Sequence, residues 1–225
     1  MSWRPTAESS ASNKRMVGLH WNGVGKQISG TEIIRPWSAT WSPEARVAVL
    51  GANGSGKSTL IQLLSGQMPP SVGELTSPYL NQDSWAMQAS WAGPGVQPPL
   101  DLSGLEWVAM HGKLRAWRND PWNYLDPSDS MWSRSLKSLS SGQRQRLLLA
   151  VAVCTDAPLL LLDEPCNHLD ESAQNWFDGM LQAELEPAHG AARMLFVASN
   201  HNPKEVRHCS SAISPQGDSV PLPKY

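Results

Sequence analysis

A glycine-rich loop holds the first residues of this chain that could do chemistry. Residues 51–59 read G-A-N-G-S-G-K-S-T and directly follow the apolar run 47–50. Glycines let backbone N–H groups turn toward an anion, the ammonium group of Lys57 can reach terminal phosphates, and the hydroxyl of Ser58 suits Mg²⁺. The loop therefore predicts a site for a nucleoside triphosphate. The residues expected to bind it are Gly51, Asn53, Gly54, Ser55, Gly56, Lys57, Ser58 and Thr59.

Two adjacent carboxylates supply the second part of the chemistry. The leucine run 159–162 has the pattern of a buried strand and ends at Asp163 and Glu164. A strand placed there would deliver Asp163 to Mg²⁺ and Glu164 to an attacking water. The glycine-rich loop alone indicates phosphate binding, and the carboxylate pair adds hydrolysis to it.

The elements that must position these residues alternate between short apolar runs and helix-type runs. That alternation is typical of an α/β sheet with helices on its faces. We expect central strands over Arg46–Leu50, Leu159–Asp163 and Met194–Ser199, and helices over 58–65 and 143–154.

The chain divides into one domain with an insertion and two tails. A stretch rich in Trp, Pro and Asp, about 96–137, is expected to be an inserted helical subdomain. Residues 1–15 are interpreted as a loose N-terminal tail and residues 210–225 as a C-terminal tail. The remaining 16–209 are expected to form a single domain, which suits a chain of 225 residues.

Composition excludes several classes of protein. Lys and Arg number 18 against 20 Asp and Glu, so a formal charge of −2 gives no strong signal for nucleic-acid binding. The longest apolar stretches are far shorter than the roughly 18 residues of a membrane span, and the N-terminal residues lack the apolar segment of a secretory signal. The three cysteines form no C-x-x-C pair, so neither a zinc site nor a disulfide framework is expected, and a reducing cytosol is the default.

The segment 139–143, L-S-S-G-Q, identifies the family that this sequence resembles. It is similar to the signature motif of ATP-binding cassette (ABC) ATPases, usually L-S-G-G-Q, with Ser141 in place of the first glycine. The order of loop, signature and carboxylate pair matches that family, and residues 165–170 resemble its D-loop. The resemblance implies a P-loop NTPase core with an ABC-type N-terminal antiparallel β-subdomain and an inserted α-helical subdomain. The signature residues carried over are Ser140, Ser141, Gly142 and Gln143.

The resemblance also implies cofactors and partners. ATP and Mg²⁺ would bind between two cassettes arranged head to tail, as a homodimer or with a related cassette, each site using the loop of one and the signature of the other. Lys57 and Glu164 would be catalytic, and Ser58 and Asp163 would hold Mg²⁺. Ser141 adds a side chain where the two backbones approach closely.

Three further roles are carried over, two of them with an alternative residue. Gln97 would sense the γ-phosphate and act as a Mg²⁺ ligand, with Gln82 as the alternative. Trp21 would stack on adenine. His201 would be the switch histidine that orients the attacking water, with Asn200 as the alternative.

The leading functional prediction is the ATP-hydrolysing subunit of an ABC transporter, located at the cytoplasmic face of the membrane through separate membrane-spanning subunits. Short cassettes of haem-exporter type, from cytochrome c maturation, are similar in size. The alternative is a soluble ABC ATPase that acts on ribosomes or DNA, which the E-P-C-N-H-L-D segment favours. A cassette that binds ATP without hydrolysing it is disfavoured by the intact Lys57, Asp163 and Glu164.

Overall fold

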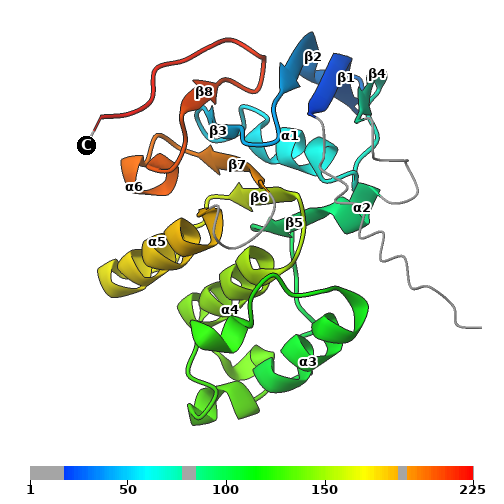
Figure 1. Ribbon diagram of the computed structural model, residues 1–225. Helices are drawn as coiled ribbons and strands as arrows, with labels where there is room; N and C mark the ends of the chain where they lie inside the picture. The colour runs from blue at the N-terminus through cyan, green and yellow to red at the C-terminus, as the bar shows by residue number, and fades with distance from the viewer. Residues whose placement is uncertain (1–17, 78–84, 187–191, 225) are drawn as a thin grey trace, which may run out of the picture.

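The computed structural model describes residues 18–77, 85–186 and 192–224 (Figure 1). Its larger sheet is parallel and has the strand order β5-β6-β7-β3-β8. The strands are β3 (Arg46–Leu50), β5 (Ala89–Ala92), β6 (Leu159–Asp163), β7 (Met194–Ser199) and β8 (Ser211–Ile213). The three expected central strands are confirmed with their bounds. β6 and β7 are buried along their whole length, as continuous apolar strands of a parallel sheet should be.

A smaller antiparallel sheet lies above the parallel one in Figure 1. Its order is β2-β1-β4, from β1 (Leu19–Ile28), β2 (Thr31–Trp41) and β4 (Val72–Thr76). A cluster of aromatic rings joins the two sheets: the ring centroids of Trp21 and Trp37 are 5.1 Å apart, and those of Trp41 and Phe196 are 5.0 Å apart. The expected ABC-type β-subdomain and α/β core are both present.

Helices cover both faces of the parallel sheet. Helix α1 lies between the two sheets, and α4 and α5 cover the opposite face (Figure 1). The α-helices are α1 (Lys57–Leu64), α2 (Trp85–Gln88), α3 (Gly104–Leu114), α4 (Ser141–Cys154), α5 (Glu171–Leu185) and α6 (Pro203–Val206). Within the described ranges, none of the helices combines the length and apolar character that a bilayer crossing needs.

The predicted helical insertion is helical only in part. Its α-helix, α3, begins at a capping box in which Ser103 and Glu106 bond reciprocally, and it ends at Leu114. The rest consists of short 3₁₀ turns at Pro121–Asn123, Ser130–Ser133 and Leu136–Ser138. These turns lead the chain back to the start of α4.

The predicted C-terminal tail is corrected by the structure. Strand β8 pairs with β3 at the edge of the parallel sheet, with Ala212 opposite Ala48. The chain then turns back, and the N–H of Val220 donates to the carbonyl of Ala212 at 3.1 Å. The domain therefore continues past residue 209. The predicted N-terminal tail, 1–15, lies outside the described residues.

Candidate functional site

The glycine-rich loop joins the end of β3 to α1. Gly54 and Gly56 have left-handed φ values of 80° and 102°, a backbone conformation that favours glycine. Lys57 is only 5% exposed, and its Nζ donates to the carbonyls of Gly51 at 2.8 Å and Ala52 at 3.1 Å. The ammonium group therefore contacts the backbone of the same loop that is expected to bind the phosphates.

A hollow of about 410 Å³ opens in front of this loop. Residues from three parts of the chain line it: Ile28 and Ile33 from the antiparallel sheet, Asn53, Gly54, Gly56, Lys57, Ser58 and Thr59 from the loop and α1, and Glu164. Loop amides, an ammonium and a hydroxyl on one side face a carboxylate on the other. This is the arrangement that a triphosphate and its attacking water require.

Asp163 is the last residue of β6 and is 1% exposed. Burial raises the pKa of its carboxyl, and the charge of Glu164 adds to that rise, while a hydrogen bond from Ser58 and the charge of Lys57 oppose it. Its Oδ1 is buried and has no hydrogen-bond partner among the residues that the structure describes. A buried carboxylate oxygen beside a hydroxyl is a donor set that fits Mg²⁺. Ser58 and Asp163 are thus the residues that would hold the ion.

Glu164 leaves the strand with a left-handed φ of 49°. Its N–H donates to the carbonyl of Ala198 at 2.9 Å, and its Oε2 accepts from Asn167 Nδ2 at 2.6 Å. Its Oε1 lies 3.8 Å from Lys57 Nζ. The carboxylate is therefore fixed on the wall of the hollow, facing the phosphate loop.

The signature segment forms a separate surface at the start of α4. Ser140 is the N-cap: its Oγ accepts from the N–H of Gln143 at 3.2 Å, and its own N–H donates to Gln143 Oε1 at 2.9 Å. Ser141 is the first helical residue. A Cβ on Gly142 would lie 2.7 Å from the carbonyl oxygen of His168, so glycine is required there by close approach.

A second hollow lies beside this segment. It is lined by Ser140, Ser141, Gly142, Gln143, Arg146, His168, Leu169, Asp170, Ser172, Ala173 and Trp176. Among the described residues, none lines both this hollow and the hollow at the phosphate loop. Within one chain the two predicted halves of the site are therefore apart, as a site shared between two cassettes requires.

Trp21 does not have the predicted role. It is 0% exposed and its ring packs against Trp37 and Trp41, so no face is open to a base. The side chains that the antiparallel sheet presents to the hollow are Ile28 and Ile33. The prediction from the sequence required an aromatic ring for the adenine contact and therefore did not include these aliphatic residues. Their apolar surface could pack against a base without stacking.

Gln97 is exposed in the loop after β5, and its role as a Mg²⁺ ligand remains a prediction. The residue that approaches Asp163 is Gly93, the first after β5, because a Cβ on it would lie 2.6 Å from Asp163 Cβ. The alternative, Gln82, lies outside the described residues. A glycine gives no side-chain signal, so the sequence alone could not place it there.

His201 follows β7 by two residues and is exposed, with a left-handed φ of 59°. β6 and β7 are parallel neighbours, so His201 and Glu164 both leave the same edge of the sheet. Asn200 is exposed as well. The switch role of His201, and the alternative of Asn200, stay predictions.

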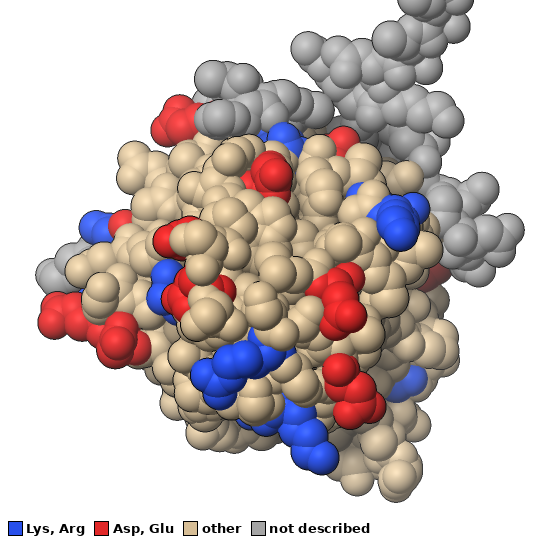
Figure 2. All heavy atoms as spheres, turned by 90° about the horizontal axis from the view of Figure 1, so that it is seen from below, with Lys and Arg blue, Asp and Glu red and all other residues tan. Residues whose placement is uncertain are grey.

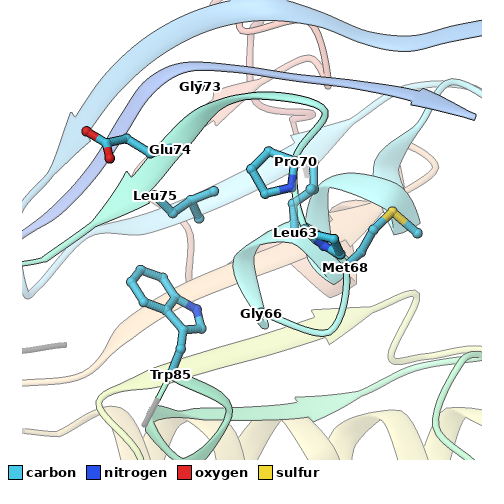
Figure 3. Close-up of a pocket in the computed structure, with 9 residues that line it drawn as sticks. Leu63, Gly66, Met68, Pro70, Gly73, Glu74, Leu75 and Trp85 are labelled. Carbon is cyan, nitrogen blue, oxygen red and sulfur yellow. The ribbon is translucent and has the colours of Figure 1, made fainter. Parts of the chain in front are cut away.

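Another hollow lies at the far end of α1 (Figure 3). Leu63, Met68, Leu75 and Trp85 give it apolar walls, and Glu74 stands at its edge. Among the described residues that line it there is no Lys or Arg. Its chemistry does not suit a polyphosphate, and the hollow at the phosphate loop stays the candidate nucleotide site.

Comparison with known proteins gives the family. The sequence pattern of the family described as ABC transporter matches residues 34–167, more than half of the chain. The chain belongs to the ABC transporter family. The predicted family and the ABC-type ATPase fold are thus confirmed.

Relatives within the ABC transporter family are named for different roles. A probable ATP-binding protein, YheS, from Haemophilus influenzae is 30% identical over 188 residues, which cover 67% of this chain and 28% of that protein. The thiamine import ATP-binding protein ThiQ from Escherichia coli is 33% identical over 153 residues, covering 60% of this chain and 62% of that protein. The chain thus spans little more than a quarter of YheS.

A solved ABC structure has the same fold. The dimeric post-hydrolysis state of the ATP-binding cassette MJ0796, bound to ADP and phosphate, superposes with a TM-score of 0.74 at 18% identity. The match covers 92% of this chain and 100% of the other. At this identity the likeness concerns the fold.

Proposed function

We propose that this chain is the nucleotide-binding subunit of an ABC transporter, which binds ATP with Mg²⁺ and hydrolyses it to drive transport through separate membrane-spanning subunits at the cytoplasmic face. The observation that carries the proposal is that Lys57, Ser58 and Glu164 line one hollow, with the buried carboxyl of Asp163 hydrogen-bonded to Ser58. Their arrangement supports hydrolysis rather than binding alone, because a positioned carboxylate faces the phosphate loop.

Each residue has a distinct task in this chemistry. Lys57 and the loop amides bind the phosphates and orient the terminal one. Mg²⁺, held by Ser58 and Asp163, would supply the positive charge that offsets charge on the leaving phosphate oxygens. Glu164 accepts the proton of the attacking water, and His201 orients that water.

The second half of the site would come from another cassette. Ser140 and the N–H groups that open α4 favour an anion, because a helix N-terminus carries partial positive charge. The separation of this surface from the phosphate loop within one chain supports a head-to-tail homodimer or a pair with a related cassette. Hydrolysis would then depend on dimer closure.

An exposed apolar surface formed by α2 and by α3 of the helical insertion supports a protein partner. Leu114, at the end of α3, is 68% exposed, and Met87 on α2 and Met110 on α3 are also exposed. Arg115 ties the two helices together, since its Nη2 donates to the carbonyl of Met87 at 2.9 Å. We assign this surface, Met87, Met110 and Leu114, to contact with a membrane-spanning subunit.

The charge distribution is less suited to a polyanion. On the α3 side of the molecule, Figure 2 shows acidic and basic side chains interspersed, with uncharged surface between them. A binding face for RNA or DNA would be expected to gather Lys and Arg. The alternative, an ATPase acting on ribosomes or DNA, keeps support from the E-P-C-N-H-L-D segment and from the greater length of relatives such as YheS.

A pull-down tests the partner. We expect tagged Glu164→Gln protein, captured with ATP from detergent-solubilised membranes of its own host, to bring down an integral membrane protein. The matched variant carrying Leu114→Glu in addition should lose that protein, because a carboxylate is placed in the apolar contact. Recovery of ribosomal proteins by both variants would contradict the transporter proposal and support the alternative.

A further inference from the structure

Glu205 is a buried carboxylate that the chemistry above does not use. It lies on α6 and is 4% exposed. Ser199 Oγ donates to its Oε2 at 2.5 Å, and the backbone N–H of Cys166 donates to its Oε1 at 3.1 Å. One side chain therefore joins the end of β7, where the loop that carries His201 begins, to the loop that follows β6.

These two loops carry the expected base and the expected switch residue. β6 and β7 pair as far as Asp163 and Ala198, and the N–H of Glu164 adds one further bond to Ala198. β6 ends at Asp163, whereas β7 continues to Ser199, which pairs with Leu50 of β3 before the chain leaves the sheet. The carboxylate of Glu205 bridges the two segments there.

The bridge ends close to two unusual backbone positions. Glu164 and His201 have φ values of 49° and 59°, in the left-handed region that non-glycine residues adopt only when their surroundings hold them. Cys166 lies two residues after Glu164, and Ser199 lies two residues before His201. Glu205 thus contacts the chain next to both positions.

Packing alone does not account for a carboxylate at this place. Burial raises the pKa of Glu205, and nearby Glu164 and Asp163 add to the rise, while the bonds from Ser199 and Cys166 lower it. A buried carboxylate is costly, and an apolar side chain of similar size would fill the same space without that cost. Unlike an apolar side chain, the carboxylate accepts two directed hydrogen bonds, one from Ser199 and one from Cys166.

We propose that Glu205 is a positioning residue for ATP hydrolysis, which holds the Glu164 loop and the His201 loop in a fixed relation to each other. The inference rests on the proposed function. Because Glu205 is not among the residues that line the nucleotide hollow, its loss should change the rate of the chemical step and leave ATP binding in place.

Two substitutions separate the bonds from the packing. Glu205→Leu keeps the volume and removes both bonds, so we expect kcat to fall about 10-fold to 100-fold with KM for ATP within about twofold of wild type. Glu205→Gln keeps one amide oxygen for the Cys166 N–H, and its NH₂ can donate to Ser199, whose hydroxyl rotates. It should restore kcat to within about threefold of wild type.

A matched control removes a buried carboxylate elsewhere. Glu184, on α5, is 0% exposed and accepts from Tyr124 Oη at 2.6 Å and Asn119 Nδ2 at 2.8 Å. Glu184→Gln should lower Tm and leave kcat unchanged at temperatures where the protein is folded. If Glu205→Leu behaves like this control, with a lower Tm and wild-type kcat, the inference is wrong.

Hydrogen exchange supplies a readout that does not need turnover. In folded, full-length Glu205→Leu, the amides of 164–170 and 199–205 should exchange faster than in wild type, and both segments should recover in Glu205→Gln. Unchanged exchange in both segments would overturn the inference. A wild type that hydrolyses no more ATP than Glu164→Gln would instead contradict the proposed function, while the exchange result would still decide whether Glu205 joins the loops.

Discussion

Lys57 Nζ lies 3.8 Å from Glu164 Oε1, so the ammonium of the phosphate loop and the expected base face each other across the hollow. Lys57 also donates to two carbonyls of its own loop. A bound triphosphate would accept hydrogen bonds from Lys57 Nζ, and Glu164 would keep its hydrogen bond from Asn167. Binding of the nucleotide and exposure of the base are thereby connected.

Glu164→Gln should remove hydrolysis and preserve ATP binding. An amide keeps the shape of the side chain but cannot accept the proton of the attacking water, so we expect kcat to fall by about 10²-fold to 10⁴-fold. Turnover is measured by phosphate release and binding by a fluorescent ATP analogue. Size-exclusion chromatography with ATP should show accumulated dimer. Equal turnover in wild type and variant would remove Glu164 as the base.

Gly142→Ala should impair closure of the dimer and reduce stability. The added Cβ would lie 2.7 Å from a backbone oxygen of His168, which has to shift, and overpacking of this kind costs about 1–3 kcal/mol. Urea unfolding measures the loss, and chromatography with ATP measures the dimer.

Gly179→Ala is the control for that substitution. Gly179 lies within α5, and a Cβ there meets nothing within 4 Å. The same chemical change should be neutral or stabilise the protein by about 0.5–1 kcal/mol. Equal losses of stability in both variants would show that close approach to His168 does not matter.

Ile28→Tyr should tighten ATP binding. Ile28 is exposed at the edge of the nucleotide hollow, and an aromatic ring there could stack on the base, which is worth about 0.5–1.5 kcal/mol. We expect Kd for ATP to fall about threefold to tenfold, as measured by isothermal titration. Val72→Tyr, at an exposed strand position that does not line this hollow, should leave Kd unchanged. A higher Kd for ATP in Ile28→Tyr than in wild type would show that the base lies elsewhere.

Asp163→Asn should stabilise the nucleotide-free protein and abolish Mg²⁺-dependent ATP binding. Burial raises the pKa of Asp163 in the folded state, so the folded protein holds the proton more tightly than the unfolded chain. The free energy of unfolding therefore falls as pH rises from the unfolded value, about 4, through the folded pKa, and stays lower above it. Asparagine at position 163 does not ionise, so the variant does not lose this part of the free energy of unfolding.

Thermal unfolding from pH 4 to pH 8 checks this expectation. The variant should have a higher Tm than wild type at pH 7, and the difference should shrink toward pH 4. A lower Tm for Asp163→Asn at pH 7 would mean that the contacts with Ser58 and Lys57 outweigh the cost of burial.

The centre of the fold and the phosphate loop could be predicted from the sequence because their signals are local. Parallel strands buried on both faces are continuous apolar runs, and β3, β6 and β7 have the bounds expected from those runs. The left-handed backbone positions in the loop can be recognised in the sequence because glycines, Gly54 and Gly56, occupy them. The carboxylate pair was located because it ends such a run.

Features set by distant contacts could not be predicted. β5 has four residues, and its polar Ser90 is accommodated only because its Oγ donates to the carbonyl of Ala152 at 2.7 Å, 62 residues away. β8 is a three-residue edge strand that pairing with β3 defines. The burial of Trp21 depends on Trp37 and Trp41, and the sequence does not state which face of a strand a tryptophan occupies.

The reciprocal bonds between Ser140 and Gln143 affect how fast two cassettes could join. The segment that would meet the partner's nucleotide is already ordered in a single chain, so little conformational entropy remains to be lost on contact. Ser140 Oγ uses a lone pair to accept from Gln143, and its hydrogen can still be donated to a phosphate oxygen. Encounter of the two chains would then be limited by diffusion and orientation rather than by folding of the contact surface.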